Sequence, residues 1–148
     1  MTEIVTSRAL PDADRLLVSD PTGWLPGPAR PNGAGKWIVT LHLGRLSRST
    51  LLELGPVWSD GTRTGRSVHW RTVREQGDAL PFEVLLPPFR GGFVADGDTL
   101  QIRGRYTPPA GAVGRTLDLM FGRLARRSLH RLLDDIAAAR SRGVSPTR

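Results

Sequence analysis

Alternating apolar and polar residues predict a series of strands along the middle of the chain. In residues 36–43 every second residue is large and apolar, namely Trp37, Val39, Leu41 and Leu43. A period of two is typical of a strand with one buried face. Runs of similar character occupy residues 50–58, 66–74, 82–86 and 100–106. We therefore expect at least five strands.

The links between these runs are short. Asp60-Gly61, within Ser59–Thr62, suits the positive φ angles of a tight hairpin turn. The segment Pro87–Gly97 contains Pro87-Pro88 and Gly91-Gly92, so we expect an irregular turn there. Sequential strands with short links favour an antiparallel meander.

Helical patterns lie on either side of the strands. Proline and acidic residues at 11–14 favour the start of a helix, and Asp20-Pro21 should end that helix. Residues 22–35 are rich in Gly and Pro and predict a loop that carries Trp24. Beyond Gly114 a period of 3.6 persists to about Ala139 and predicts a long amphipathic helix. Its apolar stripe comprises Leu117, Met120, Phe121, Leu124, Leu132, Leu133 and Ile136.

Together these elements predict one α+β domain over residues 1–140, followed by a disordered tail at 141–148. A chain of 148 residues is long enough to bury its own core. Gly104 interrupts the last strand, and we expect the C-terminal helix to cross the sheet closely at that point.

Composition narrows the functional classes. The chain has no cysteine, which excludes disulfides, thiolate metal sites and cysteine nucleophiles and suits a reducing compartment. No apolar run is long enough for a signal peptide or a membrane span, so we expect a cytoplasmic protein. The net charge is +7, yet the basic residues, all arginine except Lys36, are scattered along the chain. Nucleic acid is therefore an unlikely partner on this pattern.

Residues able to carry chemistry are few. The chain contains no phosphate-binding glycine loop, nucleophile elbow or HExxH motif. His42, His69 and His130 lack metal-ligand spacing, so we expect neither a metal nor a cofactor. Glu53 and Glu83 each interrupt an apolar strand and, with His69, are the candidate acids or bases. The competing interpretation is that all three face solvent or serve the structure.

Large side chains offer candidate walls for a ligand pocket. Tryptophan and tyrosine combine a wide apolar surface with one polar atom, which suits both cores and pockets. The candidate ligand-binding residues on the strands and loops are Trp24, Trp58, Trp70 and Tyr106, and those on the helix are Met120, Phe121 and Leu124.

Three stretches of the chain resemble a known family. They are LPDADRLLVSDPTGWLP at 10–26, SVHWRTV with LPFEVLL at 67–86, and the segment from Leu100 to Ala137. In the last stretch a strand ending in GRYTPP is followed by a glycine-bounded turn and a long amphipathic helix. The chain is similar to the START-like SRPBCC superfamily of polyketide cyclase/dehydrase-like proteins, particularly its small bacterial members of unassigned function.

The resemblance implies a helix-grip fold. In such a fold a curved antiparallel sheet wraps round the C-terminal helix, two short helices follow the first strand, and a cavity lies between sheet and helix. Members of the superfamily bind apolar ligands and some catalyse cyclisation or dehydration, but they share no universal catalytic motif.

Two functions follow as hypotheses. The first is binding or carriage of a small hydrophobic ligand in that cavity. The alternative is a polyketide aromatase/cyclase or related lyase, with His69, Glu83 or Glu53 as acid or base and Tyr106 as hydrogen-bond donor. The alternative requires at least two of these groups on the concave face of the sheet. The sequence does not indicate an oligomeric state.

Overall fold

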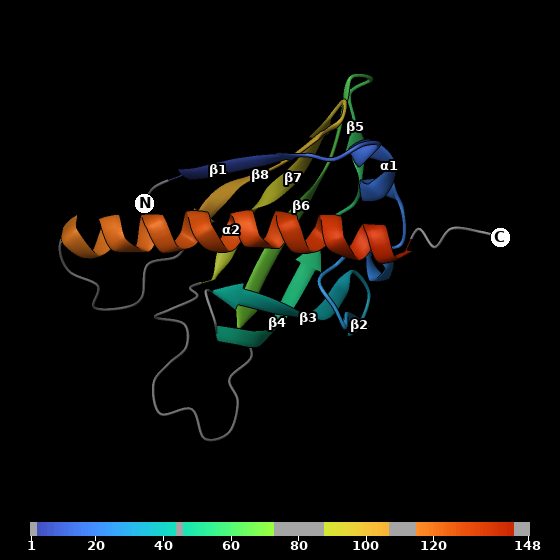
Figure 1. The fold of residues 1–148 in the computed structure, drawn as a ribbon. Helices are drawn as coiled ribbons and strands as arrows, with labels where there is room; N and C mark the ends of the chain where they lie inside the picture. The colour runs from blue at the N-terminus through green and yellow to red at the C-terminus, as the bar shows by residue number, and fades with distance from the viewer. Residues whose placement is uncertain (1–2, 44–45, 73–87, 107–114, 144–148) are drawn as a thin grey trace.

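The computed structural model describes residues 3–43, 46–72, 88–106 and 115–143 (Figure 1). The elements within these ranges, in chain order, are β1 (Glu3–Ala9), α1 (Ala13–Val18), the 3₁₀ helix η1 (Pro21–Gly23), β2 (Arg30–Pro31), β3 (Lys36–Leu43), β4 (Leu46–Leu54), β5 (Trp58–Ser59), β6 (Arg63–Thr72), β7 (Phe89–Asp96), β8 (Thr99–Tyr106) and α2 (Arg115–Gly143).

The strands form one antiparallel sheet in the order β1-β8-β7-β6-β4-β3-β2, and β5 pairs with β6 beside this path. Helix α2 packs against β1 at one side of the sheet and against β3 near the other, as well as against β8. One helix can touch both sides only because the sheet curves round it, as Figure 1 shows. The predicted α+β class, with a curved antiparallel sheet round a C-terminal helix, is confirmed.

Two short helices close one end of this arrangement. Helix α1 packs on β6 and β7 and buries Ala13, Leu16 and Leu17. The second is only the three-residue η1, which has Pro21 in its first turn and lies partly in the predicted loop. The predicted pair of short helices is thus one α-helix and one 3₁₀ turn.

Strand β7 corrects the expectation of an irregular turn at 87–97. Residues 89–96 pair along their whole length with β6 and β8. The glycines that suggested a turn serve a close approach instead, because Gly91 lies directly opposite Gly104 of β8. A β-carbon built on Gly104 would meet the Arg90 carbonyl oxygen and the Phe89 ring, both at 2.5 Å. Its nearest neighbours therefore belong to β7, and the notch that was expected to receive the helix is filled by the Phe89 ring.

Other strand predictions fare differently. The turn between β5 and β6 is the predicted hairpin turn, with Gly61 at φ 92°. The carboxylate of Asp60 accepts hydrogen bonds from the amides of Thr62, at 3.0 Å, and Arg63, at 2.7 Å. The predicted run 50–58 is split between β4, which starts at Leu46, and β5. The predicted strand at 82–86 lies outside the described residues.

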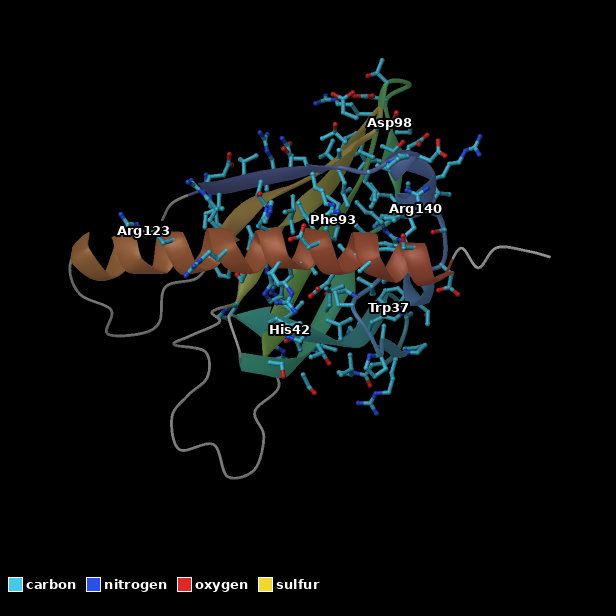
Figure 2. All side chains as sticks on the ribbon, viewed as in Figure 1. Trp37, His42, Phe93, Asp98, Arg123 and Arg140 are labelled. Carbon is cyan, nitrogen blue, oxygen red and sulfur yellow. The ribbon has the colours of Figure 1, made fainter. Side chains whose placement is uncertain are left out.

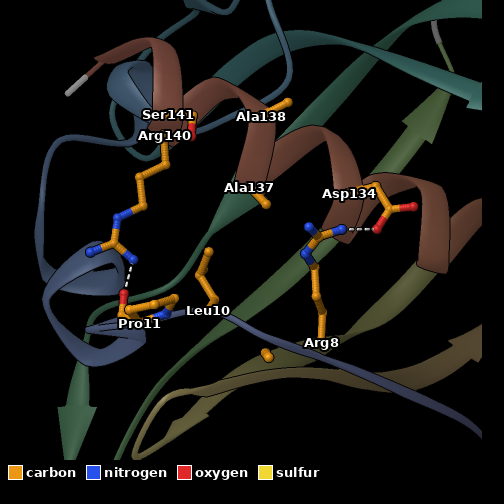
Figure 3. Close-up of a pocket in the computed structure, with 9 residues that line it drawn as sticks. Arg8, Leu10, Pro11, Asp134, Ala137, Ala138, Arg140 and Ser141 are labelled. Carbon is orange, nitrogen blue, oxygen red and sulfur yellow. Dashed lines mark hydrogen bonds and ion pairs between the residues drawn. The ribbon is translucent and has the colours of Figure 1, made fainter. Parts of the chain in front are cut away.

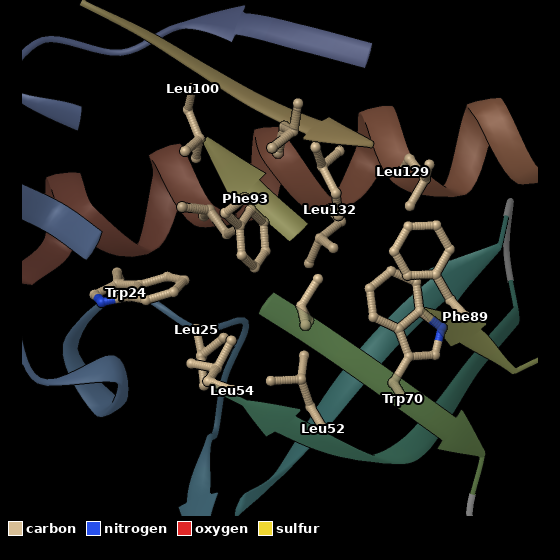
Figure 4. Close-up of a cluster of buried hydrophobic side chains, with 14 of the residues drawn as sticks. Trp24, Leu25, Leu52, Leu54, Trp70, Phe89, Phe93, Leu100, Leu129 and Leu132 are labelled. Atoms are coloured by element: carbon tan, nitrogen blue, oxygen red, sulfur yellow. The ribbon is translucent and has the colours of Figure 1, made fainter. Parts of the chain in front are cut away.

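The core lies between the concave face of the sheet and α2 (Figure 4). From the predicted helix stripe, Leu132, Leu133 and Ile136 are buried, and Leu129, which the prediction omitted, is fully buried. The side chains of Leu117, Met120, Phe121 and Leu124 lie outside the described part of the structure. Helix α2 continues to Gly143, so residues 141–143 belong to the helix rather than to the predicted tail.

Neither α2 nor any other helix in the described residues combines the length and apolar character needed to cross a membrane.

Candidate functional site

A row of aromatic residues crosses the concave face of the sheet. Trp70 of β6 lies opposite Phe89 of β7, which lies opposite Tyr106 of β8. The Trp70 and Phe89 rings stack with centroids 4.3 Å apart, and the Tyr106 ring meets Phe89 edge-on at 5.1 Å. Figure 4 shows Trp70 and Phe89 together, with Leu129 of α2 beside them. The row gives this part of the interior a continuous aromatic wall.

Tyr106 carries a polar group into this wall. Its hydroxyl lies 2.9 Å from Ser128 Oγ of α2, and that Oγ donates to the Ala125 carbonyl oxygen at 2.9 Å. Because the single serine hydrogen goes to that carbonyl, the tyrosine hydroxyl is the donor to Ser128. Burial raises the pKa of Tyr106 well above its ordinary value, and the Ser128 hydrogen bond lowers it only partly. The phenol therefore stays neutral, and its hydrogen is used in the hydrogen bond to Ser128 of α2.

The indole nitrogen of Trp70 is different. The residue is 1% exposed, and Nε1 has no hydrogen-bond partner. A buried donor without a partner costs about 1–3 kcal/mol. Trp70 Nε1 is thus the one indole nitrogen among the described residues that is both buried and unpartnered.

The structure places Trp24 and Trp58 away from this row. Trp24 is buried at the other end of the core, edge-on to Phe93 at 5.8 Å, and its Nε1 donates to the Ser19 carbonyl oxygen at 3.5 Å (Figure 4). Trp58 is 44% exposed on β5. The side chains of Met120, Phe121 and Leu124 lie outside the described residues. Of the predicted ligand-binding set, the structure brings Trp70 and Tyr106 together.

The candidate acids and bases do not converge on the aromatic row. His69 alternates with the buried residues Val68 and Trp70, so it points to the convex face of the sheet. Glu53 lies opposite His69 on β4, is exposed, and pairs with Lys36 Nζ at 3.5 Å. Glu83 lies outside the described residues. Within the described ranges, no cluster of three or more His, Asp or Glu side chains could hold a metal ion.

A groove of about 570 Å³ lies between β1 and the end of α2 (Figure 3). Arg8 of β1 pairs with Asp134 of α2, and Arg140 donates to the Pro11 carbonyl oxygen. Figure 3 shows these two contacts side by side, each linking the β1–α1 segment to the helix. Asp134 also lies 3.8 Å from His130 Nε2. Arg8 and Arg140 are thus already bonded within the protein. These two contacts, called the clamp below, hold the end of α2 against the β1–α1 segment.

Figure 2 shows how the remaining polar side chains lie relative to α2. Arg123 and Arg140 lie towards opposite ends of the helix, and His42 lies below the helix in this view, on β3. His42 alternates with the buried residue Leu41 and so shares the convex face with His69.

Sequence reasoning missed Ser128 and the clamp. Ser128 lies one position before Leu129, and its spacing to the apolar residues 132 and 136 places it on the buried stripe. A serine at such a position is a signal for a polar contact inside the core. Arg8 alternates in phase with Ile4 on β1, which likewise marks it as facing the helix.

The fold is similar to the crystal structure of TTHA0849 from Thermus thermophilus. The two chains are 16% identical and align with a TM-score of 0.50 over 97% of this chain and 100% of that one. At this identity the likeness shows the fold alone. No family model matches the sequence, and no curated protein sequence matches it either.

Proposed function

We propose that this protein binds a small apolar ligand against the aromatic row, between the concave face of the sheet and α2. The observation that carries the proposal is the unpartnered Nε1 of Trp70 within an otherwise apolar wall. Ligand sites are mostly apolar surfaces with a few placed polar groups, which is the composition found here. The resemblance to the START-like SRPBCC superfamily supports the same function.

The polar atoms of the wall narrow the ligand class. Tyr106 already donates to Ser128, so its hydroxyl hydrogen is not available. Trp70 Nε1 can only donate. The ligand we propose is therefore an apolar or aromatic molecule with one carbonyl, carboxylate or ether oxygen that accepts from Trp70. The proposal is binding or carriage, without a chemical step.

The lyase alternative has less support. It needs two acid-base groups on the concave face, and His69 and Glu53 lie on the convex face. Among the described residues, Tyr106 is the single candidate from that set on the concave face.

A matched pair of tryptophan variants tests the proposal. Binding of fatty acids, flavonoids and polyketide-like aromatics is measured by calorimetry for the wild type, Trp70→Phe and Trp24→Phe. Trp70→Phe keeps an aromatic ring and removes the free N–H, so we expect affinity for oxygen-bearing ligands to fall about 2- to 10-fold. Trp24→Phe, at the other end of the core, should leave affinity unchanged.

The thermal stability of the variants separates binding from folding. Trp70→Phe removes an unpaired buried donor and should not lower the free energy of unfolding through that group. Absence of saturable binding for every compound in the panel would reject the proposal, as would equal losses of affinity in both variants.

A further inference from the structure

The convex face of the sheet, opposite α2, carries a groove of about 550 Å³. Gly92 of β7 forms part of its floor, Trp58 of β5 lines one side, and arginines of β7 and β8 line another. These arginines, called the outer arginines below, are Arg90, Arg103 and Arg105. All three are exposed and alternate with buried residues of β7 and β8.

The outer arginines are gathered by strand register. Arg90 of β7 lies directly opposite Arg105 of β8. Arg103, two residues before Arg105, lies opposite Gly92, so its side chain is on the same face of the sheet. Like charges directly opposite each other on neighbouring strands destabilise a sheet. Within the described part of the chain, none of the three side chains has a hydrogen bond or ion pair. Across those ranges, the fold thus holds three cations together without an acidic partner.

The acidic residue closest in register does not neutralise them. Glu3 of β1 lies opposite Arg105 and lines the same groove. It forms no ion pair with Arg105 in the described structure. The groove has a net positive charge, because its described lining contains Arg66 and the three outer arginines against Glu3 alone.

Trp58 places an aromatic surface beside this charge. It lies opposite Gly65 of β6, and a β-carbon on Gly65 would overlap the Trp58 ring. The ring therefore covers Gly65, while the residue remains 44% exposed. An exposed tryptophan on a glycine platform is an unusual use of the largest apolar side chain, which is normally buried.

The basic surface extends beyond the groove along the same face. His69 lies opposite Arg90, and Arg71 follows two residues later on β6. Both are on the convex face, by alternation with Val68 and Trp70. A ligand with several negative charges in series could reach Arg71 as well as the outer arginines, whereas a single small anion would engage only part of this set.

A stacking aromatic surface beside a track of cations is the combination that binds single-stranded nucleic acid. We propose that the convex groove binds single-stranded nucleic acid, with one base stacked on Trp58 and neighbouring phosphates held by the outer arginines. A second copy that docks through the same face does not suit the groove, because the outer arginines would meet like charges. The net charge of +7 adds attraction to a polyanion at long range.

Two variants with equal charge loss test this proposal. One replaces the outer arginines (R90Q/R103Q/R105Q), and the control replaces three exposed arginines of α2 (R123Q/R126Q/R127Q). Fluorescence anisotropy follows binding of labelled dT and rU oligonucleotides of about twelve residues between roughly 50 and 200 mM salt. Circular dichroism and thermal unfolding confirm that each variant is folded.

We expect the wild type to bind single strands with a salt-dependent affinity. The outer variant should lose at least about tenfold in affinity, and its log K against log salt slope should be shallower by about 2, which is roughly 0.7 for each of three phosphate contacts. The α2 control should keep the wild-type slope. Trp58→Leu should weaken binding about fivefold or more, and Trp58→Phe should recover part of that loss.

Three outcomes would overturn the proposal. The first is a lack of salt-dependent binding by the wild type, and the second is an equal loss in the two arginine variants. The third is a mononucleotide or a duplex that competes as well as the single strand, because it would show that neither a run of phosphates nor an unpaired base is recognised.

Discussion

Gly104 is a position where one added methyl group should destabilise the fold strongly. A β-carbon there would lie 2.5 Å from the Arg90 carbonyl oxygen, 2.5 Å from Phe89 Cζ and 2.7 Å from Gly91 Cα. Carbon atoms normally keep about 3.5–4.0 Å, so each contact is short by roughly 1 Å. Two of these atoms belong to the backbone of β7. The third belongs to a ring that is 1% exposed and stacked on Trp70, so it cannot swing aside.

Gly104→Ala should therefore reach the upper end of the usual range for overpacking, about 3 kcal/mol. For a chain of this length 1 kcal/mol shifts the unfolding temperature by about 2–4 °C, so we expect a fall of about 6–12 °C. Calorimetry or thermal circular dichroism measures this change directly.

Gly92→Ala is the matched control on the same pair of strands. Its added β-carbon would come no closer than 3.4 Å, to the Arg66 carbonyl oxygen. At such a site alanine should be neutral or stabilise by about 0.4–1 kcal/mol, because it restricts the unfolded chain. An unchanged unfolding temperature for Gly104→Ala, or an equal fall for Gly92→Ala, would refute the close approach of β7 and β8.

Three further predictions concern stability. Because folding raises the pKa of Tyr106, the stability that this shift contributes is complete below about pH 10 and is lost as pH rises beyond that value. In urea unfolding, the free energy of unfolding of the wild type should therefore fall above about pH 10. Tyr106→Phe should remove that fall, while costing about 0.5–1.5 kcal/mol at neutral pH. Hydrogen bonds, chiefly from the Arg63 and Thr62 amides, lower the pKa of Asp60. Its contribution is therefore present above the ordinary aspartate pKa of 3.8 and lost at lower pH; the gap in unfolding temperature between wild type and Asp60→Ala should shrink as pH falls below that value. Leu129→Ala should cost about 2–5 kcal/mol in chemical denaturation, because this side chain of α2 is fully buried in the core, and a cost below about 1 kcal/mol would contradict this packing.

The sequence predicted the elements whose residues carry their own periodicity. The alternation at 36–43 and the helical stripe near Leu132 depend on local spacing, and both elements form where expected. Strand β7 was missed because Gly91 and Gly92 are typical of turns. A glycine is required at position 91 because Gly104, thirteen residues later, lies directly opposite it at close range. Neither segment alone predicts this pairing.

The candidate sites show the same division. Trp70 and Tyr106 were chosen as bulky side chains with one polar atom, and the concave face brings them together through Phe89. Ser128 was overlooked, although it decides which way the Tyr106 hydroxyl donates. The outer arginines were dismissed as scattered, because their clustering depends on the register between β7 and β8 rather than on their order in the chain.

The contacts of α2 with the β1–α1 segment also determine when the domain can fold during synthesis. Arg8 and Asp134 are 126 residues apart, and Arg140 and Pro11 are 129 apart. A domain joined by such distant contacts folds slowly, because long loops must close before those contacts form. The ribosome makes the 29-residue helix after the strands of the described sheet, so the concave face with Trp70 and Phe93 stays uncovered until α2 emerges. We therefore expect nascent chains that stop short of α2 to aggregate or to be held by chaperones, and emergence of α2 to trigger folding of the whole domain.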